Sequence, residues 1–104
     1  MRALVCKEFG STENLTLEEV DTPTPGKGEI LMEIKATGVN FPDVLTVQGK
    51  YQFKPELPFI PGAELAGVVS AVGEGVTSRK VGDKVIATTQ IGAFAEQCVV
   101  YEHT

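Results

Sequence analysis

Glycine and proline divide this sequence into short segments, and the spacing leaves room for barely one helix. The 104 residues include 11 glycines and 6 prolines, which mark turns and interrupt regular elements. Because a dinucleotide-binding unit alternates strands with helices, most of any nucleotide site must lie outside these residues. We expect six or seven short strands and one helix, arranged as a small antiparallel barrel or sandwich.

The segments between these breaks carry strand-like patterns. Alternation is cleanest over residues 29–37, where Ile30, Met32 and Ile34 face a core and the other face is partly wet. A strand over residues 2–9 pairs as a hairpin with one over 15–20. Further strands are expected at 63–72, 84–88 and 93–100.

One short helix is predicted between the third and fourth of these strands. It spans residues 42–48, because proline suits the first turn of a helix and Gly49 suits its C-terminal cap.

Composition and charge restrict the function classes. The chain is 42% hydrophobic and 22% charged with a net charge of −5, which is ordinary for a folded domain and unfavourable for binding nucleic acid. No apolar segment approaches the roughly 20 residues of a membrane span, and the first residues lack a signal-peptide pattern. Two isolated cysteines indicate a reducing compartment. We therefore expect a cytoplasmic domain without nucleic-acid or membrane partners.

Few residues suit metal binding or nucleophilic catalysis. Zinc sites take three or four ligands from Cys, His, Asp or Glu, whereas this chain has two cysteines and one histidine, far apart. We expect no metal site. Cys6 and Cys98 lie within predicted strands and are interpreted as buried structural residues, and His103 as an exposed one. Residues 73–78 resemble a phosphate-binding loop, but they lack a following helix and are interpreted as a hairpin turn.

One polar cluster is a better candidate site. Asn40 and Asp43 flank the predicted helix start, where they either cap the helix or handle a proton and a ligand. Glu64 opens a strand of small residues, as a salt-bridge partner or as an acid beside a cleft. Tyr51 lies on a loop, where it either packs or presents its hydroxyl to a ligand.

Several segments together resemble medium-chain dehydrogenases/reductases. Residues 36–45, Ala-Thr-Gly-Val-Asn-Phe-Pro-Asp-Val-Leu, resemble their active-site helix, and residues 58–69 resemble their P-x-x-P-G-x-E-x-x-G-x-V segment. Residues 72–76, 81–85 and 92–96 continue the match in order. The resemblance implies a GroES-like, partly open antiparallel β-barrel with one short helix, as the catalytic domain of a two-domain enzyme. A Rossmann domain binding NAD(P)H would lie outside residues 1–104, so these residues alone would be inactive.

The chain is most similar to the zinc-independent quinone oxidoreductase branch, which includes zeta-crystallin. Zinc alcohol dehydrogenases carry Cys where Asn40 stands and His where Ala63 stands, whereas Gly-Val-Asn-x-x-Asp and Gly-x-Tyr are typical of this branch. The resemblance implies hydride transfer from NADPH to a quinone or an activated alkene. It implies catalytic roles for Asn40, Asp43 and Tyr51 and cofactor contacts for Asn40 and Glu64. The alternative for Glu64 is a purely structural role.

Two alternatives remain open. One is an enoyl or enone reductase of the same superfamily, and the other is a non-catalytic GroES-like binding or assembly module. The full-length parent is expected to be a homo-oligomer.

Overall fold

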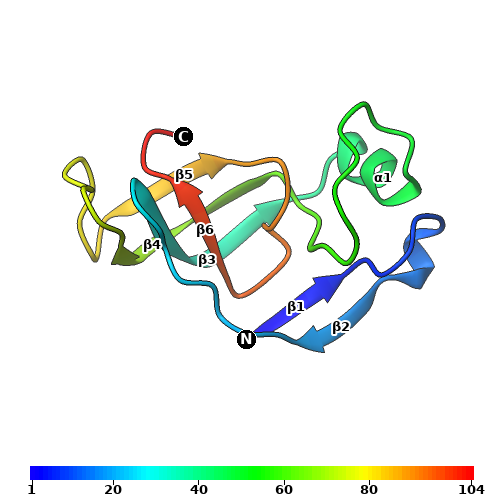
Figure 1. Cartoon of the computed structure of the whole chain (residues 1–104), viewed down its shortest axis with the longest axis horizontal. Helices are drawn as coiled ribbons and strands as arrows, with labels where there is room; N and C mark the ends of the chain where they lie inside the picture. The colour runs from blue at the N-terminus through cyan, green and yellow to red at the C-terminus, as the bar shows by residue number, and fades with distance from the viewer.

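Two antiparallel sheets and one α-helix make up the fold (Figure 1). A computed structural model describes residues 1–104. Its elements are β1 (Arg2–Val5), the 3₁₀ helix η1 (Thr12–Asn14), β2 (Thr16–Glu19), β3 (Glu29–Gly38), α1 (Phe41–Gln48), β4 (Glu64–Val72), β5 (Lys84–Thr88) and β6 (Gln97–Tyr101). Strands β1 and β2 form one sheet, and the other has the order β5-β4-β3-β6. The sheets do not close on each other, so the predicted mainly-β, partly open GroES-like barrel with one short helix is confirmed.

The ten-residue strand β3 is the centre of the larger sheet. It pairs with β6 on one side, from Glu29 opposite Tyr101, and with β4 on the other, up to Gly38 opposite Glu64. Gly67 permits the close approach of β4, because a Cβ at this position would overlap the carbonyl oxygen of Glu33. Strand β3 therefore ends beside the start of β4, where the chain turns toward α1.

The predicted alternation along β3 fails near its beginning. Ile30 and Met32 are buried as expected, but Leu31 between them is also buried. The pairing with β4 shifts register between Leu31 and Met32 and again between Ile34 and Ala36. Such irregularities bend a strand and change its twist, so a simple two-face pattern does not hold.

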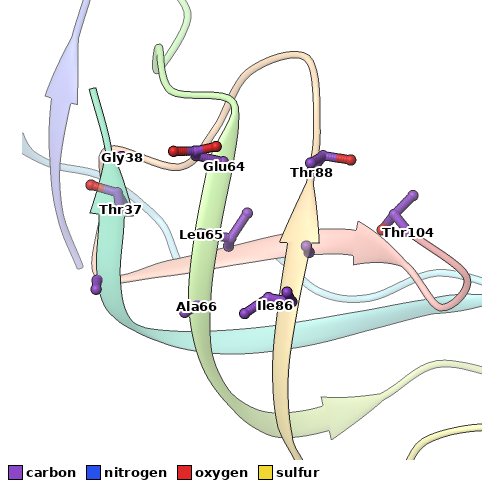
Figure 2. A pocket seen from close by; sticks show the side chains of 10 residues that line it. Thr37, Gly38, Glu64, Leu65, Ala66, Ile86, Thr88 and Thr104 are labelled. Atoms are coloured by element: carbon purple, nitrogen blue, oxygen red, sulfur yellow. The ribbon is translucent and has the colours of Figure 1, made fainter. Parts of the chain in front are cut away.

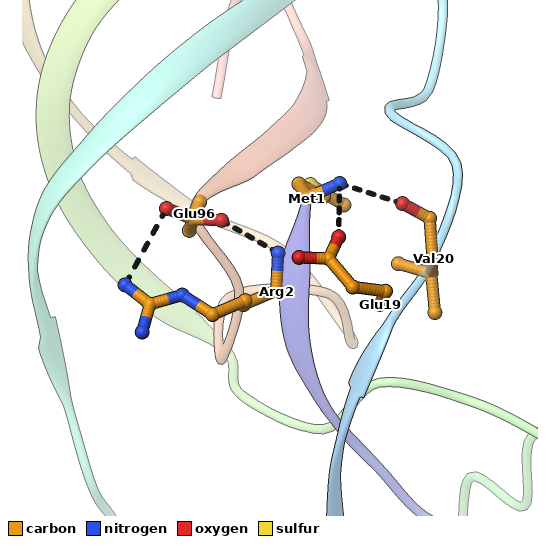
Figure 3. Close-up of polar contacts among 5 residues, drawn as sticks. All are labelled: Met1, Arg2, Glu19, Val20 and Glu96. Atoms are coloured by element: carbon orange, nitrogen blue, oxygen red, sulfur yellow. Dashed lines mark hydrogen bonds and ion pairs between the residues drawn. The ribbon is translucent and has the colours of Figure 1, made fainter.

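The hairpin of β1 and β2 forms as predicted and is tied to the larger sheet by polar contacts (Figure 3). The backbone N–H of Arg2 donates to Glu96 Oε1 at 2.6 Å, and the Arg2 guanidinium lies 3.8 Å from Glu96 Oε2. The amino group of Met1 donates to the carbonyl of Val20 at 2.7 Å and lies 3.2 Å from Glu19 Oε2. The Arg2 contacts tie the hairpin to Glu96, just before β6, and the Met1 contacts join the two ends of the hairpin to each other.

Two predicted strands were too long. The strand expected over residues 2–9 ends at Val5, because Cys6 pairs instead with Phe59 in an isolated bridge. The strand expected over 93–100 begins only at Gln97, since the N–H groups of Ala93 and Phe94 donate to the carbonyls of Gly62 and Pro61. In both places a loop takes the backbone hydrogen bonds that a sheet neighbour would otherwise take.

Buried apolar side chains form one large and one small cluster. The large cluster lies within the four-stranded sheet and its return loop: Ile30, Met32, Leu65, Val69, Ala87, Ala93, Cys98 and Val100. The small one comprises Cys6, Val47 and Phe59 and joins α1 to the end of β1. Both cysteines are free and buried, as predicted. The fold contains no helix with the length and hydropathy needed to span a bilayer.

Candidate functional site

The structure joins Asn40 and Asp43 at the N-terminus of α1. Asn40 is the N-cap residue, with extended backbone angles, and its N–H donates to Asp43 Oδ2 at 2.9 Å. The N–H of Asp43 donates in turn to the carbonyl of Asn40 at 3.0 Å. Asp43 is 6% exposed, whereas Asn40 is exposed. The buried carboxylate therefore holds the backbone at Asn40, while Asn40 itself is exposed at the surface.

The other end of α1 is capped as predicted. Gly49 adopts a left-handed conformation with φ of 73°, and its N–H donates to the carbonyls of Leu45 and Thr46. A Cβ at Gly49 would approach the Phe9 ring to 3.0–3.2 Å. Tyr51 follows on the loop and is half-buried. No hydrogen bond joins it to Asn40, Asp43 or Glu64, and it lines neither the hollow beside Glu64 nor the one beside Asp43.

Glu64 lies directly across from the last residue of β3. It pairs with Gly38, and a Cβ on Gly38 would overlap the Glu64 carboxylate. Glu64 is exposed and takes part in no ion pair. No ion-pair partner for Glu64 lies within residues 1–104, and its carboxylate lies beside Gly38, which stands two positions before Asn40 along the chain.

A hollow of about 610 Å³ opens beside Glu64 (Figure 2). Its floor is formed by small and apolar residues of β3, β4 and β5, and its rim carries the hydroxyls of Thr37, Thr88 and Thr104. Figure 2 shows the Glu64 carboxylate near Gly38 at one end of this hollow. A single carboxylate and several hydroxyls around an apolar floor suit a small, mostly apolar ligand with polar substituents.

A second hollow, of about 700 Å³, lies between β1, β3 and α1. It is mostly apolar and includes Asp43 and Val44. Ala36 and Thr37 line both hollows, so the end of β3 forms a wall between them. Asp43 and Glu64 consequently border different cavities, although sequence reasoning placed them in one site.

Two exposed apolar residues flank Asn40 and were not singled out from the sequence. Val39 is 75% exposed and Phe41 is 72% exposed. Side chains of this size are usually buried or covered by a ligand or partner. The signal in the sequence was their position on either side of the helix cap, but their exposure depends on where β3 ends relative to the sheet.

Other titratable groups show no second site. Burial raises the pKa of the Cys98 thiol to about 11 and raises that of Cys6 as well. Both thiols stay protonated at neutral pH and are unreactive. No group of three His, Cys, Asp or Glu side chains lies close enough to hold a metal ion. His103 is exposed, as expected.

Comparison with known proteins extends this description. Residues 26–104 match the family described as Alcohol dehydrogenase GroES-like domain. Quinone oxidoreductase from Lama guanicoe is 41% identical over 106 residues, covering 100% of this chain and 32% of that protein. Alcohol dehydrogenase from Moraxella sp. (strain TAE123) is 52% identical over 85 residues, covering 82% of this chain and 25% of that protein.

A solved structure agrees with these relatives. Escherichia coli quinone oxidoreductase complexed with NADPH superposes with a TM-score of 0.91 at 35% identity, covering 97% of this chain and 31% of that one. This chain thus spans about a quarter to a third of the length of these relatives. The chain belongs to the alcohol dehydrogenase GroES-like domain family, and its relatives there include quinone oxidoreductases of the medium-chain dehydrogenase/reductase superfamily.

Proposed function

We propose that residues 1–104 form the catalytic β domain of an NADPH-dependent quinone oxidoreductase-like enzyme. The enzyme would transfer a hydride from NADPH to a quinone or an activated alkene without zinc. The observation that carries this proposal is the Asn40–Asp43 pair at the start of α1, in a chain whose relatives include quinone oxidoreductases. The pair presents an exposed amide on a fixed stretch of backbone, beside apolar residues.

The residues around Asn40 fit one end of a nicotinamide cofactor. The exposed Asn40 amide offers a donor and an acceptor, as a nicotinamide carboxamide requires. Asp43 fixes the backbone from which this amide projects. Exposed Val39 and Phe41 would exclude water from a bound ring. When bound, NADPH supplies the hydride, while these residues supply orientation and a dry surface.

Most of the dinucleotide would bind elsewhere. A dinucleotide-binding unit has parallel strands joined through a glycine-rich loop and a helix. Residues 1–104 contain no such unit, because their one α-helix, α1, connects the antiparallel strands β3 and β4. A second domain would therefore hold the phosphates, and residues 1–104 alone would be inactive. Glu64 borders the 610 Å³ hollow near Gly38, and we assign it a contact to the cofactor at this hollow.

Independence from zinc rests on the side chains at two positions. By the family resemblance, zinc alcohol dehydrogenases carry the zinc ligands Cys and His at the positions where this chain has Asn40 and Ala63. An alanine supplies no ligand, and an amide is a weak one for Zn²⁺. Two separate, buried, free cysteines also support a reducing, cytoplasmic setting.

The test measures NADPH oxidation by the full-length protein that contains residues 1–104. A quinone and an enone are supplied as separate acceptors, with and without a metal chelator. We expect turnover of the quinone to survive chelation. The Asn40→Ala variant should lower kcat/KM by about 10- to 100-fold, as expected when a positioned hydrogen-bonding group is lost near the reacting ring.

Matched variants separate the site from general effects. Asn14→Ala removes an exposed amide from η1 and is the control for Asn40→Ala. Tyr101→Phe removes a hydroxyl from β6 and is the control for Tyr51→Phe. Activity with enones alone would favour the enone reductase. Absence of NADPH oxidation with either acceptor would overturn the proposal and favour a binding module. Loss of activity on chelation would overturn its zinc-independent part.

A further inference from the structure

The loop of residues 50–58 runs from the end of α1 toward β4, and both of its ends are tied to the chain that follows β1. At its start, the N–H of Gly10 donates to the carbonyl of Val47, in the last turn of α1, at 3.0 Å. At its far end, Cys6 and Phe59 exchange two backbone hydrogen bonds of 2.8 and 3.0 Å. One short segment after β1 therefore fixes the points where the loop leaves α1 and where it returns.

Phe9 lies between these two ties along the chain, and its ring is packed in place. A Cβ on Gly49, the C-terminal cap of α1, would approach the ring to 3.0–3.2 Å. The ring centroid lies 6.0 Å from that of Phe59, and Phe9 packs against the small cluster of Cys6, Val47 and Phe59. Because these contacts come from α1 and from the far end of the loop, the half-buried ring has a fixed place beside the loop.

Lys54, the middle residue of the loop, lies over this ring. Its Nζ is 4.8 Å from the centroid of Phe9, within the roughly 6 Å at which the negative face of an aromatic ring attracts a cation. Lys54 takes part in no ion pair within residues 1–104, so the ring is the partner of its charge. The buried Pro55 that follows restricts the backbone of Lys54 to extended conformations, which reduces the entropy lost when the loop is ordered.

We propose that Phe9 and Lys54 are positioning residues for Tyr51, because their contact fixes the middle of the loop that carries it. With Gly49 held on one side and Lys54 on the other, only residues 50–53 lie between two fixed points. A shorter free segment has fewer conformations, so Tyr51 is presented in a narrower range of positions. Neither Phe9 nor Lys54 lines either hollow, so both act through the loop and not by touching a ligand there.

This inference rests on the proposed function, in which Tyr51 contacts the acceptor. Loss of the contact between Phe9 and Lys54 should weaken acceptor binding, because a mobile Tyr51 must be ordered each time an acceptor binds. Binding of NADPH and the hydride step involve Asn40, at the opposite end of α1, and should change little. A loosened loop should therefore raise the KM for the quinone and leave kcat unchanged.

The first test is chymotrypsin cleavage after Tyr51 in the native full-length protein, because the cleavage rate reports how often the loop opens. Lys54→Met removes the charge and should speed this cleavage about two- to fivefold, as expected for loss of a cation–π contact at an exposed site. Lys54→Arg keeps the cation and should be cleaved like the unmodified protein. Lys50→Met is the matched control, since it removes a charge from the same loop at an exposed lysine without an aromatic contact. Each rate is divided by that of a peptide of matching sequence.

Replacing the ring tests whether the two side chains act together. Phe9→Leu should also speed the cleavage, and adding Lys54→Met to it should have no further effect, because the partner of the charge is already gone. Three results would each overturn the proposal: unchanged cleavage in Lys54→Met, an acceleration of equal size in Lys50→Met, or a full further acceleration in the double variant.

Steady-state kinetics of the full-length enzyme test the link to Tyr51. Lys54→Met should raise the KM for the quinone about two- to fivefold, while kcat and the KM for NADPH stay unchanged, and Lys54→Arg should restore the KM. Faster cleavage without any change in the quinone KM would overturn the positioning role. Cleavage needs no turnover, so absence of NADPH oxidation would contradict the proposed function and leave the cleavage rates as the test of the contact between Phe9 and Lys54.

Discussion

The four-stranded sheet and the region formed by β1, β2 and α1 differ in the size of their buried apolar clusters. The cluster in the sheet has eight residues and includes Met32, whereas the cluster in the other region has three and includes Phe59. The hairpin compensates with polar ties such as the contacts of Arg2 with Glu96. Asn40 and Asp43 lie where β3 passes into α1, at the seam of the two regions. The geometry of the candidate site therefore depends on the less densely packed region and can be lost while the sheet stays folded.

The largest effect is expected from Met32→Ala. Met32 is completely buried in the large cluster, so truncation removes contacts and leaves a cavity. The free energy of unfolding should fall by about 2–5 kcal/mol, measured by denaturant titration. Leu17→Ala is the control, because Leu17 is 67% exposed and should change stability little. Equal losses for both variants would contradict the placement of the core.

Phe59→Ala should produce a more local effect. Phe59 packs with Cys6 and Val47, and its ring centroid lies 6.0 Å from that of Phe9. Amide hydrogen exchange should accelerate in β1 and α1 while β3 and β4 stay protected, because regions with few buried contacts open separately. Uniform acceleration throughout the chain would show that the two regions unfold as one. Phe41→Ala, at a 72% exposed ring, serves as the control.

Asp43→Ala tests the junction between β3 and α1. It removes the acceptor of the Asn40 N–H, and loss of a helix-capping carboxylate costs about 1 kcal/mol. Exchange of the α1 amides should accelerate more than exchange in the sheet. Asp21→Ala removes an exposed carboxylate that makes no hydrogen bond or ion pair and should leave both measurements unchanged. Equal protection of the α1 amides from exchange in the two variants would show that Asp43 does not stabilise the start of α1.

The smallest effect concerns the tie between the regions. The hydrogen bond from the Arg2 N–H lowers the pKa of Glu96 below its ordinary value. This carboxylate therefore contributes stability above its unfolded-state pKa of about 4.3, and the contribution is lost as pH falls through the lowered folded-state pKa. Glu96→Gln should flatten the decline in stability below about pH 5. Glu56→Gln, at an exposed carboxylate, should retain the decline of the unmodified chain.

Local patterns predicted the individual elements well. Strand β3 was expected over 29–37 and occupies Glu29–Gly38, and the helix expected over 42–48 occupies Phe41–Gln48. Alternation, an early proline and a following glycine are signals within a few residues. The ends of β1 and β6 depend on loops distant in sequence, because Cys6 pairs with Phe59, and Phe94 donates to Pro61. No local pattern contains that information.

The sequence identified residues of the candidate site, but it did not predict how they are arranged in space. The spacing of Asn40 and Asp43 indicated a cap, and the hydrogen bond between them confirms it. The division of Asp43 and Glu64 between two hollows follows from where β3 lies in the sheet. The exposure of Val39 and Phe41 has the same origin. Roles of Tyr51 and Glu64 with a cofactor stay predictions.

The pairing of β3 with β6 also determines how the chain reaches its fold. Glu29 must meet Tyr101, and β4 pairs with β3 from across the whole α1 segment. Such non-local pairs close large loops before any contact energy is gained, so domains of this kind fold in about milliseconds to seconds rather than microseconds. During synthesis on the ribosome, one hydrogen-bonding edge of β3 stays unpaired until residues 97–101 have emerged. The central strand is thus the last to be completed, and the nascent chain is most prone to aggregation during that interval.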